Sequence, residues 1–463
     1  MQIKERSNLL EDQNVALTKV TEYIFAPFHT YVFLDLDELK FNKELDVPSK
    51  LINSLNSIPI TNHNLNAKVQ WNREDSNELK KAKGVFANQG QSNSLIYAEL
   101  IPTEGKGFPI LEKVSDKLPQ NALSFEKVRF YFRESGVGTC SAKIQIESID
   151  DFNLIELEHI SESINKLFKV YFEDICFELT QAYSRVISEL SISAFSFDFM
   201  PTLKKENKEK ACIPWTHRIY HIHDERLFEL DNPGQPFKYI LTPSKKEDIV
   251  DLSIYEDKYI YFGWGHSLIL TKDTTKNYVQ TQTQVKEYVR LVEIAQSNWQ
   301  CFDLLSNIVD LARYSFSRNG KKLSFRRLKR DIYEIRFFNK YVDQILDDAR
   351  EIRVTFDTEK RNLLVEMQKR WNSLDMLSNV QEKMALVENM LDFLYHRLKE
   401  QRDDTLNVVL LFITILSMSQ IIAIIIDYTQ EIFQFSPYMK LFILGNGVLA
   451  TLLSIFLILR SKS

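Results

Sequence analysis

The chain has 463 residues, 26% of them charged, and a formal net charge of −5 at pH 7. This acidic balance argues against direct binding of nucleic acid, which usually needs a basic surface. The cysteines are widely scattered and form no CxxC pair, which argues against a disulfide framework and a four-thiolate zinc site; they are Cys140, Cys176, Cys212 and Cys301.

Residues 1–275 are expected to form an α+β domain. Runs rich in β-branched and aromatic residues predict strands at 31–34, 95–98, 128–132, 142–146, 218–223, 239–241, 258–262 and 267–270. The glycine-containing segment 135–138 is expected to join 128–132 to 142–146 as a strand pair. An amphipathic pattern over 151–190 predicts one or two helices. Residues 1–20 are polar and charged, so no signal peptide is expected and the domain is predicted to be cytoplasmic.

Residues 276–405 are expected to form a stalk of long helices. From Lys321 to Ser436 there is neither a glycine nor a proline to end a helix. Apolar residues alternate at spacings of three and four, typical of a coiled coil, in two seams: Ile335, Phe338, Val342, Ile345, Ala349, Ile352 and Phe356, and then Met384, Val387, Leu391, Leu394 and Leu398. Because no breaker separates Leu398 from Asn407, the helix is expected to continue directly into a membrane.

Two uncharged apolar runs, Asn407–Ile426 and Leu441–Leu459, predict a two-helix transmembrane hairpin. About 20 helical residues cover the ~30 Å hydrocarbon core of a bilayer. We expect a first span over 406–427, an external loop over 428–439 and a second span over 440–460. Basic residues stand before the first run and after the second, as in Arg402 and Arg460, so both termini are expected on the cytoplasmic side of the inner (plasma) membrane.

This layout resembles the CorA family of divalent-cation channels, and Thr405–Val409 is similar to the start of that family's pore helix. The resemblance implies a homopentamer whose first span lines a central pore. Phe412 would then form an apolar constriction, with polar residues contacting water beside it. The predicted pore-lining residues are Leu406, Phe412, Thr414, Ser417, Gln420 and Ala423, although the hydroxyl residues could equally pack between helices. Asp427 and Glu431 are candidates for a cation-concentrating pore mouth, or for a solvated loop.

The family's Gly-Met-Asn selectivity motif is absent, because the corresponding stretch reads Gln430–Phe433. In this the chain resembles the CorA-like membrane effectors of type III CRISPR systems. That resemblance implies antiviral defence by a channel gated by a nucleotide messenger, of the type that joins S-adenosylmethionine to AMP. The alternative is a divergent transporter of Mg²⁺, Co²⁺ or Zn²⁺, gated by metal at stalk carboxylates such as Asp343, Asp347 and Asp348. A membrane-tethered scaffold without conduction is a third reading.

Two segments are candidates for reading a nucleotide. In the first, Trp215, Arg218, His221 and His223 offer stacking and phosphate contacts. The two histidines, with Cys212 and His217, could instead hold zinc, or all of these residues could simply pack. In the second, Trp264 and His266 stand beside Gly263 and Gly265, where the backbone can approach a ligand or form an ordinary turn. No nucleophile elbow, P-loop, HExxH or paired-carboxylate signature occurs, so catalysis is not expected.

Overall fold

A computed structural model describes residues 15–34, 47–58, 60, 67–73, 96–102, 121–192, 194–195, 213–242, 247–272, 278–318, 325–351, 357–433, 436–439, 441–443, 445–447 and 449–450. The chain divides into two compact units. The first comprises Met1–Ser317 with Asn339–Ala385, and the second comprises Arg318–Phe338 with Leu386–Ser463. Each unit is described by itself.

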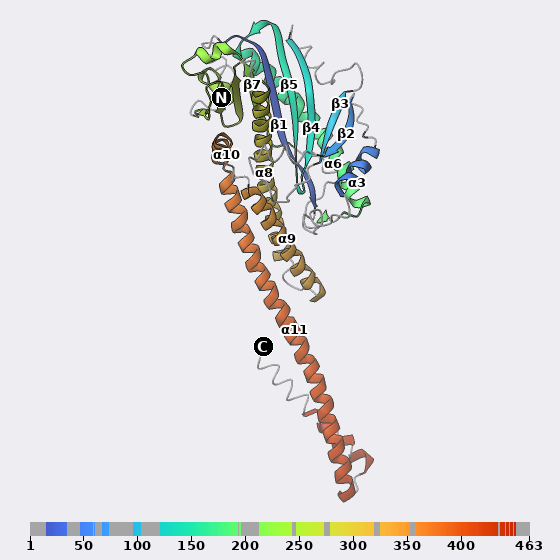
Figure 1. Ribbon diagram of the computed structural model, residues 1–463. Helices are drawn as coiled ribbons and strands as arrows, with labels where there is room; N and C mark the ends of the chain where they lie inside the picture. The colour runs from blue at the N-terminus through green and yellow to red at the C-terminus, as the bar shows by residue number, and fades with distance from the viewer. Residues whose placement is uncertain are drawn as a thin grey trace. The chain divides into compact units, whose positions relative to one another are not determined.

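The first unit is built on one mixed ten-stranded sheet with the strand order β2-β3-β4-β5-β1-β7-β10-β9-β8, to which β6 adds beside β1 (Figure 1). The β7–β10 pair is parallel and the other neighbours are antiparallel. The strands are β1 (Leu17–Leu34), β2 (Ala67–Arg73), β3 (Ile96–Pro102), β4 (Asn121–Phe132), β5 (Ser135–Phe152), β6 (Ala194–Phe195), β7 (His217–His223), β8 (Val250–Asp251), β9 (Lys258–Phe262) and β10 (His266–Thr271). The predicted β4–β5 pair is confirmed, with Phe132 opposite Gly138.

Strand β1 is much longer than the predicted segment 31–34. Both faces of this strand are buried, so its buried residues do not alternate with exposed ones. Pro27, which lacks a backbone donor, and the charged Glu22 also interrupt the strand pattern. The ladder with β5 shifts register between His29 and Phe33, where Tyr31 has a positive φ of 53°. The sequence pattern therefore identified only the last four residues of this strand, and missed the long regular ladder before them.

Helices cover both faces of the sheet. Helix α6 (Leu154–Glu189) begins with a capping box, in which the side chains of Asn153 and Glu156 each bond the other's backbone N–H. Its apolar side packs with α3 (Val47–Ser57) on one face, through residues such as Leu157 and Ile164. The opposite face, which carries Ile219 and Ile269, packs against α8 (Tyr278–Arg318) and α10 (Thr358–Arg370). The predicted helix over 151–190 is thus a single helix.

Residues 239–241, predicted to be a strand, are helical. They belong to α7 (Lys238–Leu241), which follows the short 3₁₀ helices Glu225–Glu229 and Gln235–Phe237. Pro236 starts the second of these turns, and the backbone N–H of Thr242 bonds the carbonyl of Lys238. The tight local turn outweighs the β preference of Tyr239 and Ile240 because both Ile240 and Leu241 are buried by it.

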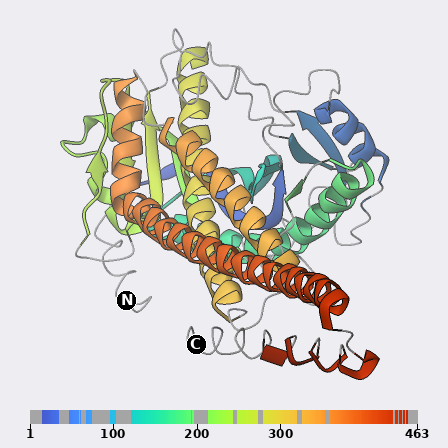
Figure 2. The ribbon, with the colours of Figure 1, turned by 90° about the horizontal axis from the view of Figure 1, so that it is seen from below.

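Helix α11 (Ser373–Phe433) is 61 residues long and unbroken (Figure 2). It starts after a corner at Trp371 and Asn372, where Asn372 has a φ of 50°. Within the first unit Lys383 of α11 bonds Ser306 of α8 at 2.7 Å. The predicted passage from the second seam into the first apolar run as one helix is confirmed. The helix continues past Asp427, the expected end of the span, because the next proline after its start is Pro437.

The second unit contains the first part of α9 (Phe325–Glu351), up to Phe338, and α11 from Leu386 onward. The guanidinium of Arg336 lies 4.9 Å from the ring centre of Tyr395. Seam residues are buried on both helices, among them Ile335, Phe338, Val387 and Leu394. Ile352 and Phe356 of the first predicted seam lie outside the described residues.

One helix of the described chain is long and apolar enough to cross a membrane: Ser373–Tyr428, with a mean hydropathy of 2.7 in its most apolar window and 6% of that window buried. The predicted second span, 440–460, is described only in short helical pieces at 441–443, 445–447 and 449–450. The two-helix hairpin therefore stays a prediction, and so does the pentamer.

Candidate functional site

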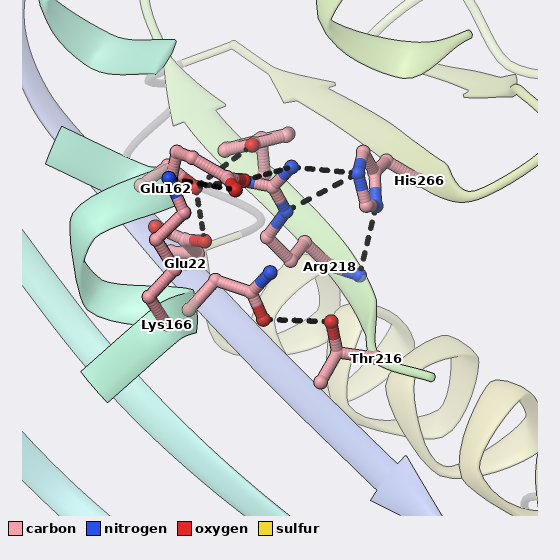
Figure 3. A network of polar contacts seen from close by, with 9 residues as sticks. Glu22, Glu162, Lys166, Thr216, Arg218 and His266 are labelled. Atoms are coloured by element: carbon pink, nitrogen blue, oxygen red, sulfur yellow. Dashed lines mark hydrogen bonds and ion pairs between the residues drawn. The ribbon is translucent and has the colours of Figure 1, made fainter. Parts of the chain in front are cut away.

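A buried polar network lies between α6 and the sheet (Figure 3). Glu22 on β1 is directly opposite Tyr220 on β7, and Arg218 of β7 is beside His266 of β10. Since side chains alternate along a strand, these residues emerge on the same face, under α6. Helix α6 supplies Ser161, which is completely buried. Four elements that are distant in sequence thus bring their polar side chains to one place.

Arg218 is the centre of this network. Its Nη1 donates to Oγ of Ser161 at 2.8 Å, and its Nη2 lies 2.7 Å from Nε2 of His266. A second contact joins Nη2 to a carboxylate oxygen of Glu162 at 3.7 Å. The Ser161 hydroxyl in turn donates to Oε1 of Glu22 at 2.5 Å and lies 2.9 Å from the Tyr220 hydroxyl. The guanidinium donors are therefore directed to internal partners.

Glu22 is fully buried, and burial raises its pKa from the ordinary 4.5 to about 7. Arg218 and the Ser161 hydrogen bond oppose this shift, while Glu158 and Glu162 add to it. Its second oxygen, Oε2, has no hydrogen-bond partner among the described residues. A desolvated carboxylate with one unmet oxygen favours the protonated form, so this site can hold or release a proton near neutral pH.

Replacing Glu22 with glutamine should flatten the pH dependence of stability. The folded-state pKa lies above the unfolded one, so the carboxyl's contribution is complete below pH 4.5 and is lost as the pH rises through about 7. Through this group the parent is expected to lose up to about 3 kcal/mol of unfolding free energy between pH 5 and pH 8, and Glu22→Gln should not show that loss. Thermal unfolding at pH 5 and pH 8 measures this. Glu229→Gln, at an exposed carboxylate that does not contribute to the Glu22 shift, is the control and should change little.

The two predicted ligand histidines of β7 lie on the other face of the sheet. His221 and His223 both approach Oγ1 of Thr271, at 2.9 and 2.8 Å. Burial lowers the pKa of His221 to about 3, so its imidazole is neutral. The sheet thus separates these histidines from the Arg218 and His266 pair, and the predicted ligand residues do not form one cluster.

Trp215 belongs to an aromatic cluster on that same face. Its ring centre lies 5.6 Å from that of Trp299 and 5.1 Å from that of Trp371, both edge-to-face. His217 stacks on Phe262 at 5.8 Å. The side chain of Trp264 is 48% exposed, and only its backbone carbonyl takes part, by accepting from Nε1 of Trp371 at 3.1 Å.

Sequence reasoning named Arg218 and His266 but missed Glu22, Ser161, Trp299 and Trp371. Glu22 is a charged residue directly before the apolar run Tyr23–Phe25. A charge in such a place was a usable signal, because a charged side chain that is buried needs a partner. Ser161 follows the apolar Ile160 on the helix side predicted to be buried. Nothing local in the sequence indicates that Trp299 and Trp371 would meet.

Metal binding finds no support in the described part of the chain, where no three His, Cys, Asp or Glu side chains are grouped to hold an ion. Cys212, a predicted zinc ligand, lies outside the described residues. His217 and His221 instead bond Ser267 and Thr271, each at 2.9 Å.

The predicted pore-lining residues all lie on α11. Leu406 and Phe412 are 51% and 62% exposed. The Thr414 hydroxyl donates to the carbonyl of Leu410 at 2.8 Å, so its hydrogen bond is satisfied within the helix. Asp427 is exposed, and Glu431 belongs to α11 with its side chain outside the described set.

No protein-family model matches the chain, and no curated protein matches it.

Proposed function

We propose that the chain is a CorA-like membrane effector, in which a nucleotide messenger bound by the α+β domain opens a pore formed by the apolar part of α11. The observation that carries this proposal is the continuity of α11, a helix of 61 residues. Its first residues pack within the α+β unit, and its later residues form an apolar segment long enough to cross a bilayer.

The exposure of that segment supports membrane insertion. Its side chains include exposed residues such as Leu410, Ile413, Leu416 and Ile424. In a water-soluble protein, apolar residues in this number would normally be covered by other elements. Lipid or neighbouring copies of the same segment provide that cover in the proposed oligomer.

The absence of the Gly-Met-Asn motif supports a pore without high selectivity for Mg²⁺. A hydrated Mg²⁺ ion requires oxygen ligands in a well-defined octahedral arrangement. The corresponding segment, Gln430–Phe433, belongs to α11 through its last residue. In this proposal the pore releases ions broadly once the apolar constriction at Phe412 widens.

Ligand preference tests the proposal against metal transport. The purified protein should be stabilised by an S-adenosylmethionine–AMP adduct, because a ligand that binds only the folded state raises stability by mass action; at 100 times its Kd the gain is about 2.7 kcal/mol. Measuring the unfolding temperature with the adduct, with oligoadenylates and with Mg²⁺, Co²⁺ or Zn²⁺ distinguishes a nucleotide-gated effector from a metal transporter. Stabilisation by a metal alone would contradict the nucleotide proposal and favour the transporter.

A further inference from the structure

The first turns of α9, in the second unit, carry an exposed basic surface. Residues Phe325–Arg330 read FRRLKR, with four basic residues and no acidic one. The side chains of Arg326, Lys329 and Arg330 are exposed. Arg330 also lies 3.5 Å from a carboxylate oxygen of Glu334, but an exposed ion pair of this kind contributes little and leaves the surface positive.

These cations share one side of the helix with an exposed aromatic ring. Residues three and four apart are neighbours on a helix surface, which places Arg326, Arg330 and Tyr333 side by side. The buried residues Ile332 and Ile335 lie on the opposite side, against the rest of the second unit. The basic face of α9 therefore consists of Arg326, Lys329, Arg330 and Tyr333, and the ring of Tyr333 is 69% exposed. Tyrosine is enriched where proteins meet the polar surface of a membrane.

The packing of α9 on α11 gives the level of this face along α11. In the second unit the two helices run in opposite directions (Figure 1), and the guanidinium of Arg336 lies 4.9 Å from the ring centre of Tyr395. Arg326 comes about 15 Å before Arg336 on α9, and Thr405 comes about 15 Å after Tyr395 on α11, at 1.5 Å per residue. The first turn of α9 is thus level with Thr405, directly before the predicted start of the span.

The exposure of α11 changes at the same level. Leu398, Gln401 and Asp403 are partly buried, whereas every residue over Asp404–Leu410 is exposed. The apolar run starts at Asn407, which is only about 6 Å beyond Asp403 along the helix. Other elements of the second unit therefore cover α11 up to the apolar run and no further.

The positive charge at this level comes from α9. Helix α11 has two exposed cations there, Lys399 and Arg402, but also Glu400, Asp403 and Asp404, and Asp403 lies 3.6 Å from Arg402. On α9 the Cα–Cβ bonds tilt towards the N-terminus of the helix, which is its end nearest the apolar run. Its basic side chains are thereby directed towards the surface of a bilayer that α11 crosses, within the reach of about 8 Å that charges have at physiological ionic strength.

From this arrangement we infer that the basic face of α9 binds anionic phospholipid headgroups in the leaflet on the side of the α+β domain. The inference rests on the insertion of α11 that the proposed function requires. Near an anionic membrane each basic residue strengthens attachment about fivefold. Nucleic acid offers the same phosphate chemistry, but the net charge of −5 and the adjoining apolar run favour a membrane. Lipid bound here holds the end of the stalk at the bilayer surface.

Acetylation of Lys329 in the full-length protein tests the inference. The protein is reconstituted in nanodiscs of phosphatidylcholine, or of equal parts phosphatidylcholine and phosphatidylglycerol. Mass spectrometry follows the modification of Lys329 by a water-soluble acetylating reagent, because an amine held against headgroups reacts more slowly. Lys166 of α6, whose side chain is 70% exposed, is the internal reference.

Two double variants are compared with the parent. Arg326→Gln/Arg330→Gln removes two charges from the basic face at exposed positions and keeps Lys329 as the reporter. Arg73→Gln/Arg185→Gln is the matched control, because it removes two exposed arginines of the first unit. With phosphatidylglycerol we expect Lys329 to react at least about fivefold more slowly in the parent and in the control. The slowing should nearly vanish in Arg326→Gln/Arg330→Gln, since attachment weakens about 25-fold.

Equal reaction rates of Lys329 in the two lipids, or undiminished slowing in Arg326→Gln/Arg330→Gln, would overturn the inference. The same slowing by inorganic phosphate or single-stranded RNA, added to phosphatidylcholine nanodiscs, would also overturn it. Adduct-triggered ion flux without slowing by anionic lipid would overturn the inference alone. Slowing by anionic lipid without adduct-triggered flux would uphold it and contradict the proposed gating, whereas a parent chain that does not insert into nanodiscs would contradict both.

Discussion

Replacing Arg218 with methionine should destabilise the α+β unit by about 3–5 kcal/mol, the usual cost of removing one partner of a buried ion pair. The side chain is 4% exposed, and its loss leaves Glu22 without its opposing charge and Ser161 without a donor. Glu22 would then stay protonated to higher pH, because the charge that now favours its ionised form is gone. The loss of stability should therefore be greater at pH 8 than at pH 5.

A double-mutant cycle separates the lost pair from the lost packing. Arg218→Met and Glu22→Gln are measured singly and together by thermal unfolding at pH 8. The combined variant should recover a large part of the stability lost in Arg218→Met, since neither charge then remains buried without a partner. If the combined variant instead changes the unfolding free energy by the sum of the two single changes, Glu22 and Arg218 do not interact as the structure describes.

Lysines placed in the apolar part of α11 should remove the chain from membranes. Ile413 and Ile421 lie in the apolar run and are 53% and 51% exposed. A lysine near the centre of a spanning helix costs about 2.5–3.5 kcal/mol, so the double variant Ile413→Lys/Ile421→Lys should lose about 5–7 kcal/mol of insertion free energy. Alkaline extraction of isolated membranes measures the fraction of integral protein.

The matched control is Val365→Lys on α10, where the parent side chain is 57% exposed. A lysine there meets water, so extraction should be unchanged. Resistance to extraction equal to the parent in the double variant would show that this part of α11 is not in the hydrocarbon core. Release of the parent itself by alkali would lead to the same conclusion.

Elements governed by local sequence could be predicted. Helix α11 follows from the lack of any glycine or proline from Lys321 to Ser436, and α6 follows from its apolar periodicity. Strand β1 was largely missed because it is buried on both faces and contains Pro27, which masks the alternation that identifies strands. Residues 239–241 illustrate a local turn that overrides β preference.

The candidate sites depend on topology, which no local pattern encodes. Arg218 and His266 could be singled out as unusual residues, but their partner Glu22 lies on β1, and Ser161 lies on α6. The alternation of β7 also places His221 on the opposite face from Arg218, which divides residues that adjoin in sequence. Trp299 and Trp371 meet only because the corner before α11 packs on α8.

Ion release from proteoliposomes would show directly whether a ligand of the α+β domain opens a membrane pore. Liposomes loaded with a fluorescent reporter of monovalent ions are reconstituted with the full chain and exposed to the S-adenosylmethionine–AMP adduct on the side of that domain. We expect rapid ion release with the adduct and little release with Mg²⁺ alone. Adduct that binds the protein without any ion release, or selective uptake of Mg²⁺ that needs no nucleotide, would contradict the proposed gating.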